Sequence, residues 1–289
     1  MGIVSGIMSK PFGPARFVTC GDGVRLAWRE LGAGPPLLLV HGWPLHGATW
    51  RQLAPLLAQR HRLVIVDLAG LGDSEAAAAT DLRIEAHAER LRELTAQVIP
   101  GDHGCIATNT GATIARVLAA RSPGLRRLLL LNTEMPGHRP PWIRWYQALF
   151  AVPGGGALFG ALTTRPSVLR SAMGFGGCFV DRDRIGGEFH ELFVAPVQHD
   201  RRRRRGMMRY LRAIDWRTVD ALRALHKTLP CRVHLVWGAE DPTFPVALAR
   251  EMCSQFAPPA TFAEVAGARL LVHEEQPEAV AREALPFFA

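Results

Sequence analysis

The sequence lacks the signatures of several protein classes. Its five cysteines are scattered, odd in number and never form a CxxC pair, which argues against a disulfide framework or a cysteine-based zinc site. Cysteines of this kind indicate a reducing compartment, so we expect a cytoplasmic protein. No apolar run reaches the ~18 residues that cross a bilayer, and residues 1–13 have no signal-peptide pattern.

Cofactor motifs are also missing. Neither GxGxxG nor GxxxxGK[ST] occurs, so we expect no nucleotide cofactor. His138, His190 and His199 are spread along the chain without the close pairing that metal ligands show. The sequence therefore predicts neither a cofactor nor a metal.

The charge balance is basic, with 34 Lys and Arg against 26 Asp and Glu and a formal net charge of +8. Part of the excess is the unbroken run Arg201 to Arg205. Nucleic-acid-binding segments interleave basic with aromatic residues, and this run does not, so we favour a solvated helix face. We expect a small organic molecule as partner, with no nucleic acid and no membrane, and a homodimer is left open.

A chain of 289 residues with 48% hydrophobic residues can form one large domain with an insertion. Short continuous apolar runs predict strands that are buried on both faces, and helical patterns lie between them. The runs are 37–40, 63–66, 104–107, 128–131 and 233–237, with 260–265 as a weaker one. Alternation of this kind predicts an α/β fold with a mostly parallel, doubly wound sheet.

The alternation breaks between Gly137 and Arg223, where glycines, prolines and helical patterns replace the strand-like runs. We predict a core of residues 1–136 and 224–289 and a helical cap of residues 137–223, inserted between two strands. Such a cap covers the carboxyl ends of the strands, where open α/β sheets bind ligands.

Three strand ends carry candidate chemistry. HGWP (41–44) and DLAGLGDS (67–74) each follow a strand, and Ala107 to Gly111 joins a strand to a helix with Asn109 at the centre of the turn. A central residue there is raised at the positive end of the helix. The backbone N–H groups of Trp43 and Thr110 would line an oxyanion hole beside it.

These motifs, in this order and with the tail 267–277, resemble the α/β-hydrolase superfamily. Within it they are most similar to the epoxide hydrolase and haloalkane dehalogenase branch. The resemblance implies the α/β-hydrolase fold with a cap, and an attacking aspartate in the turn. In this sequence the position of that aspartate is Asn109, and a carboxamide is a poor nucleophile.

The resemblance also places a general-base histidine seven residues before Pro277, and that position is Leu270. His273 lies three residues away and reaches the site only if the loop is shifted. Asp241 matches the acid of the family's triad, and Glu134 lies where some dehalogenases have theirs. Tyr210 resembles the cap tyrosine that holds an epoxide oxygen, although a tyrosine packed on the cap with its hydroxyl in water is an equal alternative.

The resulting hypothesis is an enzyme for a small or mid-sized apolar organic substrate, which family analogy suggests is a secondary metabolite. It works by non-covalent acid/base chemistry such as elimination, isomerisation or epoxide-opening cyclisation, without an aspartyl-ester intermediate. Two alternatives are a catalytically silent ligand-binding protein and a hydrolase with misregistered or altered catalytic residues.

The candidate residues fall into two groups. The candidate catalytic residues are Asn109, Asp241, Glu134 and Tyr210. The candidate substrate-binding residues are Trp43, Thr110, Trp142, Trp145, Tyr146, Leu270 and His273, the aromatic ones in the cap serving either as core or as pocket lining.

Overall fold

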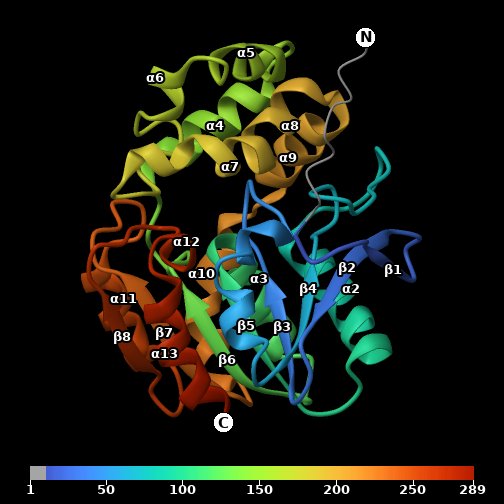
Figure 1. The fold of residues 1–289 in the computed structure, drawn as a ribbon, viewed down its shortest axis with the longest axis vertical. Helices are drawn as coiled ribbons and strands as arrows, with labels where there is room; N and C mark the ends of the chain where they lie inside the picture. Colours follow the sequence, from blue (N-terminus) through green and yellow to red (C-terminus); the bar gives the residue numbers. More distant parts are fainter. Residues whose placement is uncertain (1–10) are drawn as a thin grey trace.

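The computed structural model describes residues 11–289, in which one eight-stranded sheet has the order β1-β2-β4-β3-β5-β6-β7-β8 (Figure 1). The prediction about a signal peptide in residues 1–13 lies largely outside the described residues. The strands are β1 (Arg16–Thr19), β2 (Arg25–Leu31), β3 (Pro36–Val40), β4 (Arg62–Val66), β5 (His103–Thr108), β6 (Leu125–Leu131), β7 (Arg232–Gly238) and β8 (Thr261–Val265). The six strands from β3 to β8 are parallel, and β1 and β2 are antiparallel. The predicted fold class is confirmed.

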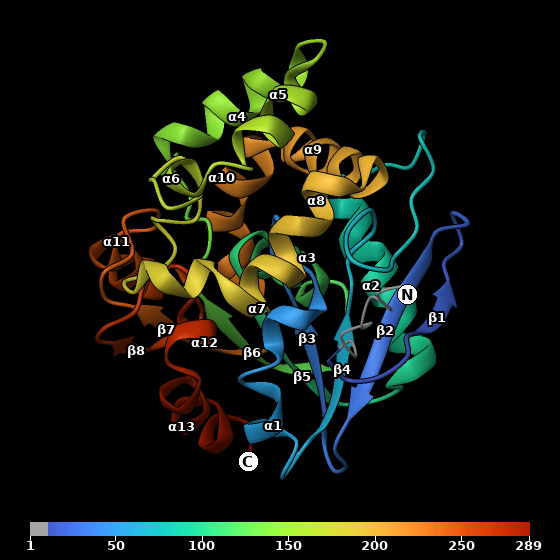
Figure 2. The same cartoon turned by 45° about the horizontal axis from the view of Figure 1, so that its top comes forward.

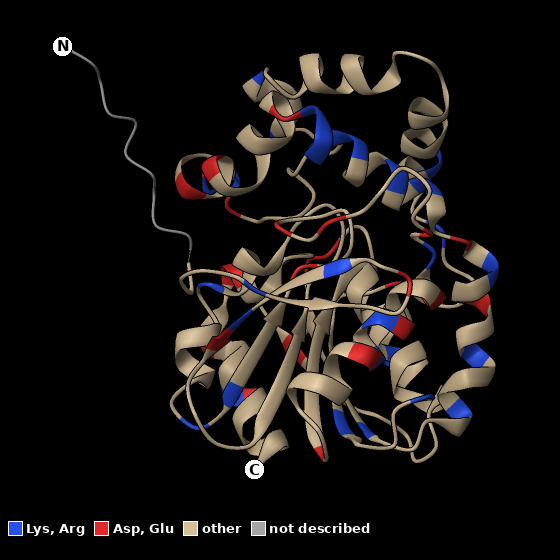
Figure 3. Cartoon of the chain, turned by 90° about the vertical axis from the view of Figure 1, so that its right-hand side faces the viewer, with Lys and Arg blue, Asp and Glu red and all other residues tan. Residues whose placement is uncertain are grey.

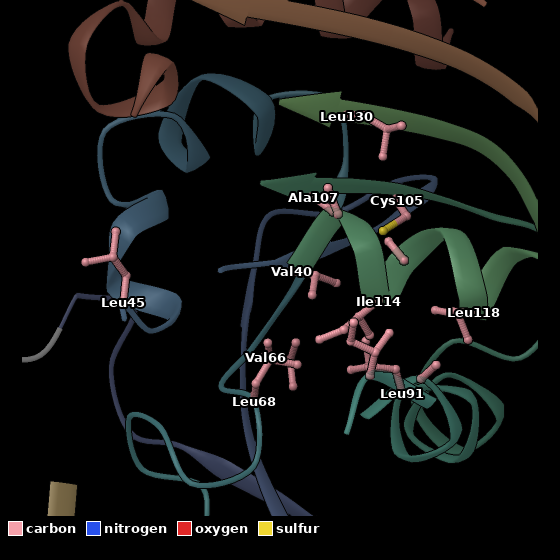
Figure 4. Packing of buried hydrophobic residues seen from close by; sticks show 14 of the residues in the cluster. Val40, Leu45, Val66, Leu68, Leu91, Cys105, Ala107, Ile114, Leu118 and Leu130 are labelled. Atoms are coloured by element: carbon pink, nitrogen blue, oxygen red, sulfur yellow. The ribbon is translucent and has the colours of Figure 1, made fainter. Parts of the chain in front are cut away.

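The central strands are buried on both faces because helices cover both sides of the sheet. One side packs against α2 (Ile84–Val98), α3 (Asn109–Ala119) and α11 (Val246–Met252), and the other against α1 (Ala54–Leu57) and α13 (Pro277–Phe288). Figure 4 shows the first layer, in which Val40, Val66 and Cys105 face Ile114 of α3 and Leu91 of α2. Short helices η1 (Gly47–Trp50), η4 (His226–Thr228), η5 (Cys253–Gln255) and α12 (Val272–Glu275) complete the core.

Between β6 and β7 the chain forms only helices and loops. They are α4 (Pro141–Ala151), α5 (Gly155–Leu162), α6 (Pro166–Leu169), η2 (Arg182–Ile185), α7 (Gly187–Phe189), the π-helical turn η3 (His190–Val194), α8 (Ala195–His199), α9 (Arg201–Ala213) and α10 (Trp216–Leu225). Most of these helices lie over the end of the sheet toward which the parallel strands run (Figures 1 and 2). We call residues 137–223 the cap. Helix α10 extends past residue 223 and packs against α3 of the core.

No helix among residues 11–289 combines the length and apolar character that crossing a bilayer requires.

Candidate active site

The turn between β5 and α3 holds Asn109 in a left-handed backbone conformation, with φ of +51°. Few residues other than glycine adopt this conformation, and it is found where a side chain is raised at a strand-to-helix turn. The turn packs tightly because a Cβ at Gly42 or Gly111 would clash with Asn109 or with the backbone of His41. The Asn109 N–H donates to Asn132 O at 2.9 Å. The turn thus has the backbone conformation of a strand-to-helix turn that carries a nucleophile, but the residue at its centre is an asparagine.

Two backbone donors lie beside Asn109, and both are engaged within the chain. The Thr110 N–H donates to Asn109 Oδ1 at 2.6 Å. The Trp43 N–H donates to Thr110 Oγ1 at 2.9 Å. A ligand oxygen gains these donors only when the Asn109 and Thr110 side chains turn away from them.

A cavity of about 220 Å³ lies between the core and the cap, directly over this turn. Most of its wall is apolar and comes from α4, α5 and the segment around α6, and Leu270 and Phe244 add core residues. Of the candidate residues, the cavity wall includes Trp43, Asn109, Thr110, Glu134, Trp142, Tyr146 and Leu270. A largely apolar cavity with a few polar groups is suited to a small organic ligand.

Glu134 follows β6 and puts a buried carboxyl group into the cavity wall. Its Oε2 accepts a hydrogen bond from Thr113 Oγ1 at 2.8 Å and lies 3.1 Å from Thr133 Oγ1. Burial raises the pKa of Glu134, against the opposing effect of its hydrogen bonds and of Arg116. A carboxyl group with a raised pKa holds its proton closer to neutral pH, as a general acid must.

Arg116 forms hydrogen bonds with Glu134 and with the two threonines that contact its carboxyl group. Its Nη2 donates to Thr113 Oγ1 at 3.0 Å, to Thr133 Oγ1 at 2.9 Å and to Glu134 O at 2.9 Å. Burial lowers the pKa of Arg116 to about 10, so the guanidinium stays charged at neutral pH. Sequence reasoning missed this network, although an arginine inside the apolar helix pattern of α3 was a signal that could have found it.

Asp241 follows β7 but does not form part of the cavity wall, which its neighbours Pro242 and Thr243 reach instead. Its Oδ2 accepts from Asn132 Nδ2 and its Oδ1 from the Thr243 N–H, each at 2.7 Å. Burial raises the pKa of Asp241 to about 7, against these hydrogen bonds. Both carboxylates thus have raised pKa values, but Glu134 is the one in contact with the cavity.

The expectation that His273 binds substrate is wrong. The His273 Nε2 lies 2.8 Å from Thr49 Oγ1, and its ring packs on Trp50 with the centroids 4.7 Å apart. Burial, with Arg51 nearby, lowers the pKa of His273 to about 3. The side chain points to η1 because α12 begins at Val272, while Leu270 occupies the cavity wall.

Two cap residues also lie outside the cavity. Trp145 is 72% exposed on α4 and is absent from the cavity wall that Trp142 and Tyr146 help to form, so the expectation that it contacts substrate is corrected. Tyr210 is buried with its hydroxyl 3.0 Å from Thr110 Oγ1, and it is absent from the cavity wall. Neither expectation for Tyr210 fits, since its hydroxyl is neither in water nor in the cavity but holds Thr110.

Among residues 11–289, no group of His, Cys, Asp or Glu is arranged to hold a metal ion.

The strand order, the elbow after β5 and the covering cap define an α/β-hydrolase-fold protein. A family model described as the alpha/beta hydrolase family matches residues 37–283. The chain therefore belongs to the alpha/beta hydrolase family.

Individual relatives agree with this family. The chain is 36% identical over 107 residues to a pimeloyl-[acyl-carrier protein] methyl ester esterase of Aeromonas hydrophila, covering 37% of this chain and 41% of that protein. It is 33% identical over 116 residues to a soluble epoxide hydrolase of a Corynebacterium species, covering 40% of each. The chain thus spans about two fifths of the length of these curated relatives. The second match supports the epoxide hydrolase-like branch.

The solved structures show the same fold. An alpha/beta hydrolase fold protein from Burkholderia ambifaria superposes with a TM-score of 0.79 at 23% identity, over 94% of this chain and 97% of that one.

Proposed function

We propose that this chain is an enzyme that transforms a small or mid-sized apolar organic substrate by non-covalent acid/base chemistry, without an aspartyl-ester intermediate. The observation that carries the proposal is Glu134, a buried carboxyl group with a raised pKa in the wall of an apolar cavity. It stands beside an elbow that carries Asn109, and Leu270 fills the position of the base. The names of the relatives suggest epoxides and esters as the first compounds to test.

The reaction that these groups suit best is an epoxide-opening cyclisation. Protonated Glu134 gives its proton to the epoxide oxygen while a hydroxyl oxygen of the same substrate attacks an epoxide carbon. The proton of that hydroxyl then passes to the Glu134 carboxylate, so the acid is regenerated and no water is consumed. The apolar wall holds the substrate in a reactive conformation, which can contribute several kcal/mol through proximity.

Elimination and isomerisation use the same acid with other substrates. In each case Asn109 acts as a hydrogen-bonding group rather than a nucleophile. Arg116 and Thr113 position the Glu134 carboxyl from the side away from the cavity.

The test is turnover of hydroxy-epoxides in ¹⁸O-labelled water. We expect a cyclic product without label, and we expect Glu134→Gln to lower kcat about 10²–10⁴-fold, the usual contribution of a general acid. Asp241→Asn is the matched control, since Asp241 is outside the cavity. Efficient incorporation of label from water would overturn the proposal.

A second candidate is a ligand-binding protein without catalysis. The observation in its favour is that the Trp43 and Thr110 N–H groups are already hydrogen-bonded within the chain, so the oxyanion hole is closed. This candidate predicts that Glu134→Gln binds ligands as the unaltered chain does and that neither form yields product.

A further inference from the structure

Helices α4 and α5 form a hairpin whose outer face is apolar and exposed. Trp145 is 72% exposed, Val152 54% and Leu158 52%. The other exposed positions on this face include Ala148, Pro153 and Ala161. We call this surface the hairpin face. Scattered apolar residues are ordinary on protein surfaces, but a contiguous apolar patch marks a place where something else binds.

The segment that contains the hairpin face carries charge of one sign. Residues 135–180 contain no Asp or Glu, and their charged residues are Arg139, Arg144, Arg165 and Arg170. Arg139 pairs with Asp220 and Arg170 with Asp183. Arg144 and Arg165 are exposed and have no ion pair within the described part of the chain. Figure 3 shows the contrast, with the uppermost cap helices mostly tan and blue segments below them.

Helix α9 contacts α5 and carries further exposed arginines. At 100° per residue, Arg201, Arg205 and Arg212 fall on one side of the helix, and all three are exposed. Their neighbours around the helix contact α5, since Arg204 lies against Gly160 and Met208 against Gly156. Arg205 and Arg212 line surface hollows together with core residues of the segment 70–82, so the arginine border of the hairpin face consists of Arg144 and Arg165.

We propose that the hairpin face and its arginine border dock on the surface of a bilayer that contains anionic lipids. An exposed tryptophan and aliphatic side chains enter the boundary between headgroups and acyl chains, and arginines at the margin attract anionic headgroups. This binding is peripheral and needs no membrane-spanning helix. It replaces the expectation of no membrane partner, which rested on the absence of a spanning run.

A second copy of the chain fits this surface less well. A symmetric dimer places the same patch against itself, which brings the bordering arginines together with no carboxylate from residues 135–180 to neutralise them. An acidic protein would match the arginines but would leave the uncharged centre around Trp145 without a complementary feature.

The position of the cavity agrees with this docking. The inner sides of α4 and α5 contribute Ile143, Tyr146 and Phe159 to its wall. Met173 also lines the cavity and is 48% exposed, so the cavity wall extends to the surface at this residue. The docking surface does not depend on the chemistry proposed above.

The test is co-sedimentation of the full chain with vesicles of phosphatidylcholine alone or mixed with phosphatidylglycerol. We expect binding to the mixed vesicles, weakened by salt because charge contributes. Leu158→Glu should weaken it about tenfold or more, as expected when one buried leucine is lost from the contact. Leu248→Glu is the matched control, because Leu248 is 36% exposed on α11 in the core, and it should bind as the unaltered chain does.

Three results would overturn the proposal. One is no sedimentation with mixed vesicles. Another is an equal loss for Leu158→Glu and Leu248→Glu. The third is a dimer in sedimentation equilibrium that Leu158→Glu dissociates, which assigns the face to a second copy. Circular dichroism of both variants checks that they are folded.

Discussion

Restoring the two family residues, Asn109→Asp with Leu270→His, should create ester-forming hydrolysis in this chain. Asp fits the place of Asn109 closely, because the side chains have the same shape and Asn109 Oδ1 already accepts the Thr110 N–H at 2.6 Å. The conformation at φ +51° suits either residue. Leu270 lines the same cavity, so an imidazole there would share it with the new carboxylate.

The magnitude follows from what the two groups supply. A nucleophile and a general base act as a unit, so each single variant should hydrolyse little more than the unaltered chain. Together they should raise hydrolysis of a small epoxide by about 10²-fold or more, the lower range for general-base catalysis. The His in an apolar wall should lower the free energy of unfolding by about 1–3 kcal/mol, which leaves a folded chain.

The assay is a single turnover in ¹⁸O-labelled water followed by mass spectrometry of the peptide that contains residue 109. Label in the carboxylate introduced by Asn109→Asp, and only in the double variant, is the signature of an ester that water has cleaved. The reasoning is refuted if the double variant is folded, binds the epoxide and neither turns it over nor gains label. The elbow would then lack the geometry of a nucleophile despite its backbone.

Three further predictions concern single groups. If protonated Glu134 is the acid, kcat should fall as pH rises through its raised pKa, and a rate that instead increased with pH would contradict this role. The pKa of Asp241 is raised to about 7 by burial, so the folded state binds a proton that the unfolded state releases near its ordinary pKa of about 4. Stability should therefore decrease as pH rises from about 4 to 7, and urea titrations should show a flatter pH dependence for Asp241→Asn. A Cβ at Gly111 would clash with the His41 backbone, so Gly111→Ala should lower the thermal midpoint strongly, whereas Gly21→Ala, with only ordinary contacts, should not.

The sheet could be predicted because its strands are covered on both faces and read as continuous apolar runs. The elbow could be predicted because a strand, a glycine-bounded turn and a helix follow one another around Asn109. The direction in which the His273 side chain points could not be predicted from the sequence, because it depends on where α12 begins after an irregular loop. The same holds for Trp145 and Tyr146, which are adjacent in sequence but lie on the outer and inner faces of α4.

The ionisable groups of the cavity wall explain how an asparagine at position 109 and a leucine at position 270 fit the proposed chemistry. Burial raises the pKa of Tyr146 to about 12 and that of Cys178 further still, so both stay neutral at ordinary pH. Glu134 is then the one acid in the described cavity wall whose pKa is shifted from an ordinary carboxyl value toward neutrality. An aspartate at position 109 would add a second carboxyl group to the same apolar space, and the two groups would then titrate as a coupled pair. With a carboxamide and a leucine at these positions, Glu134 titrates without such a partner, and this is the arrangement that the proposed proton transfer without a covalent intermediate uses.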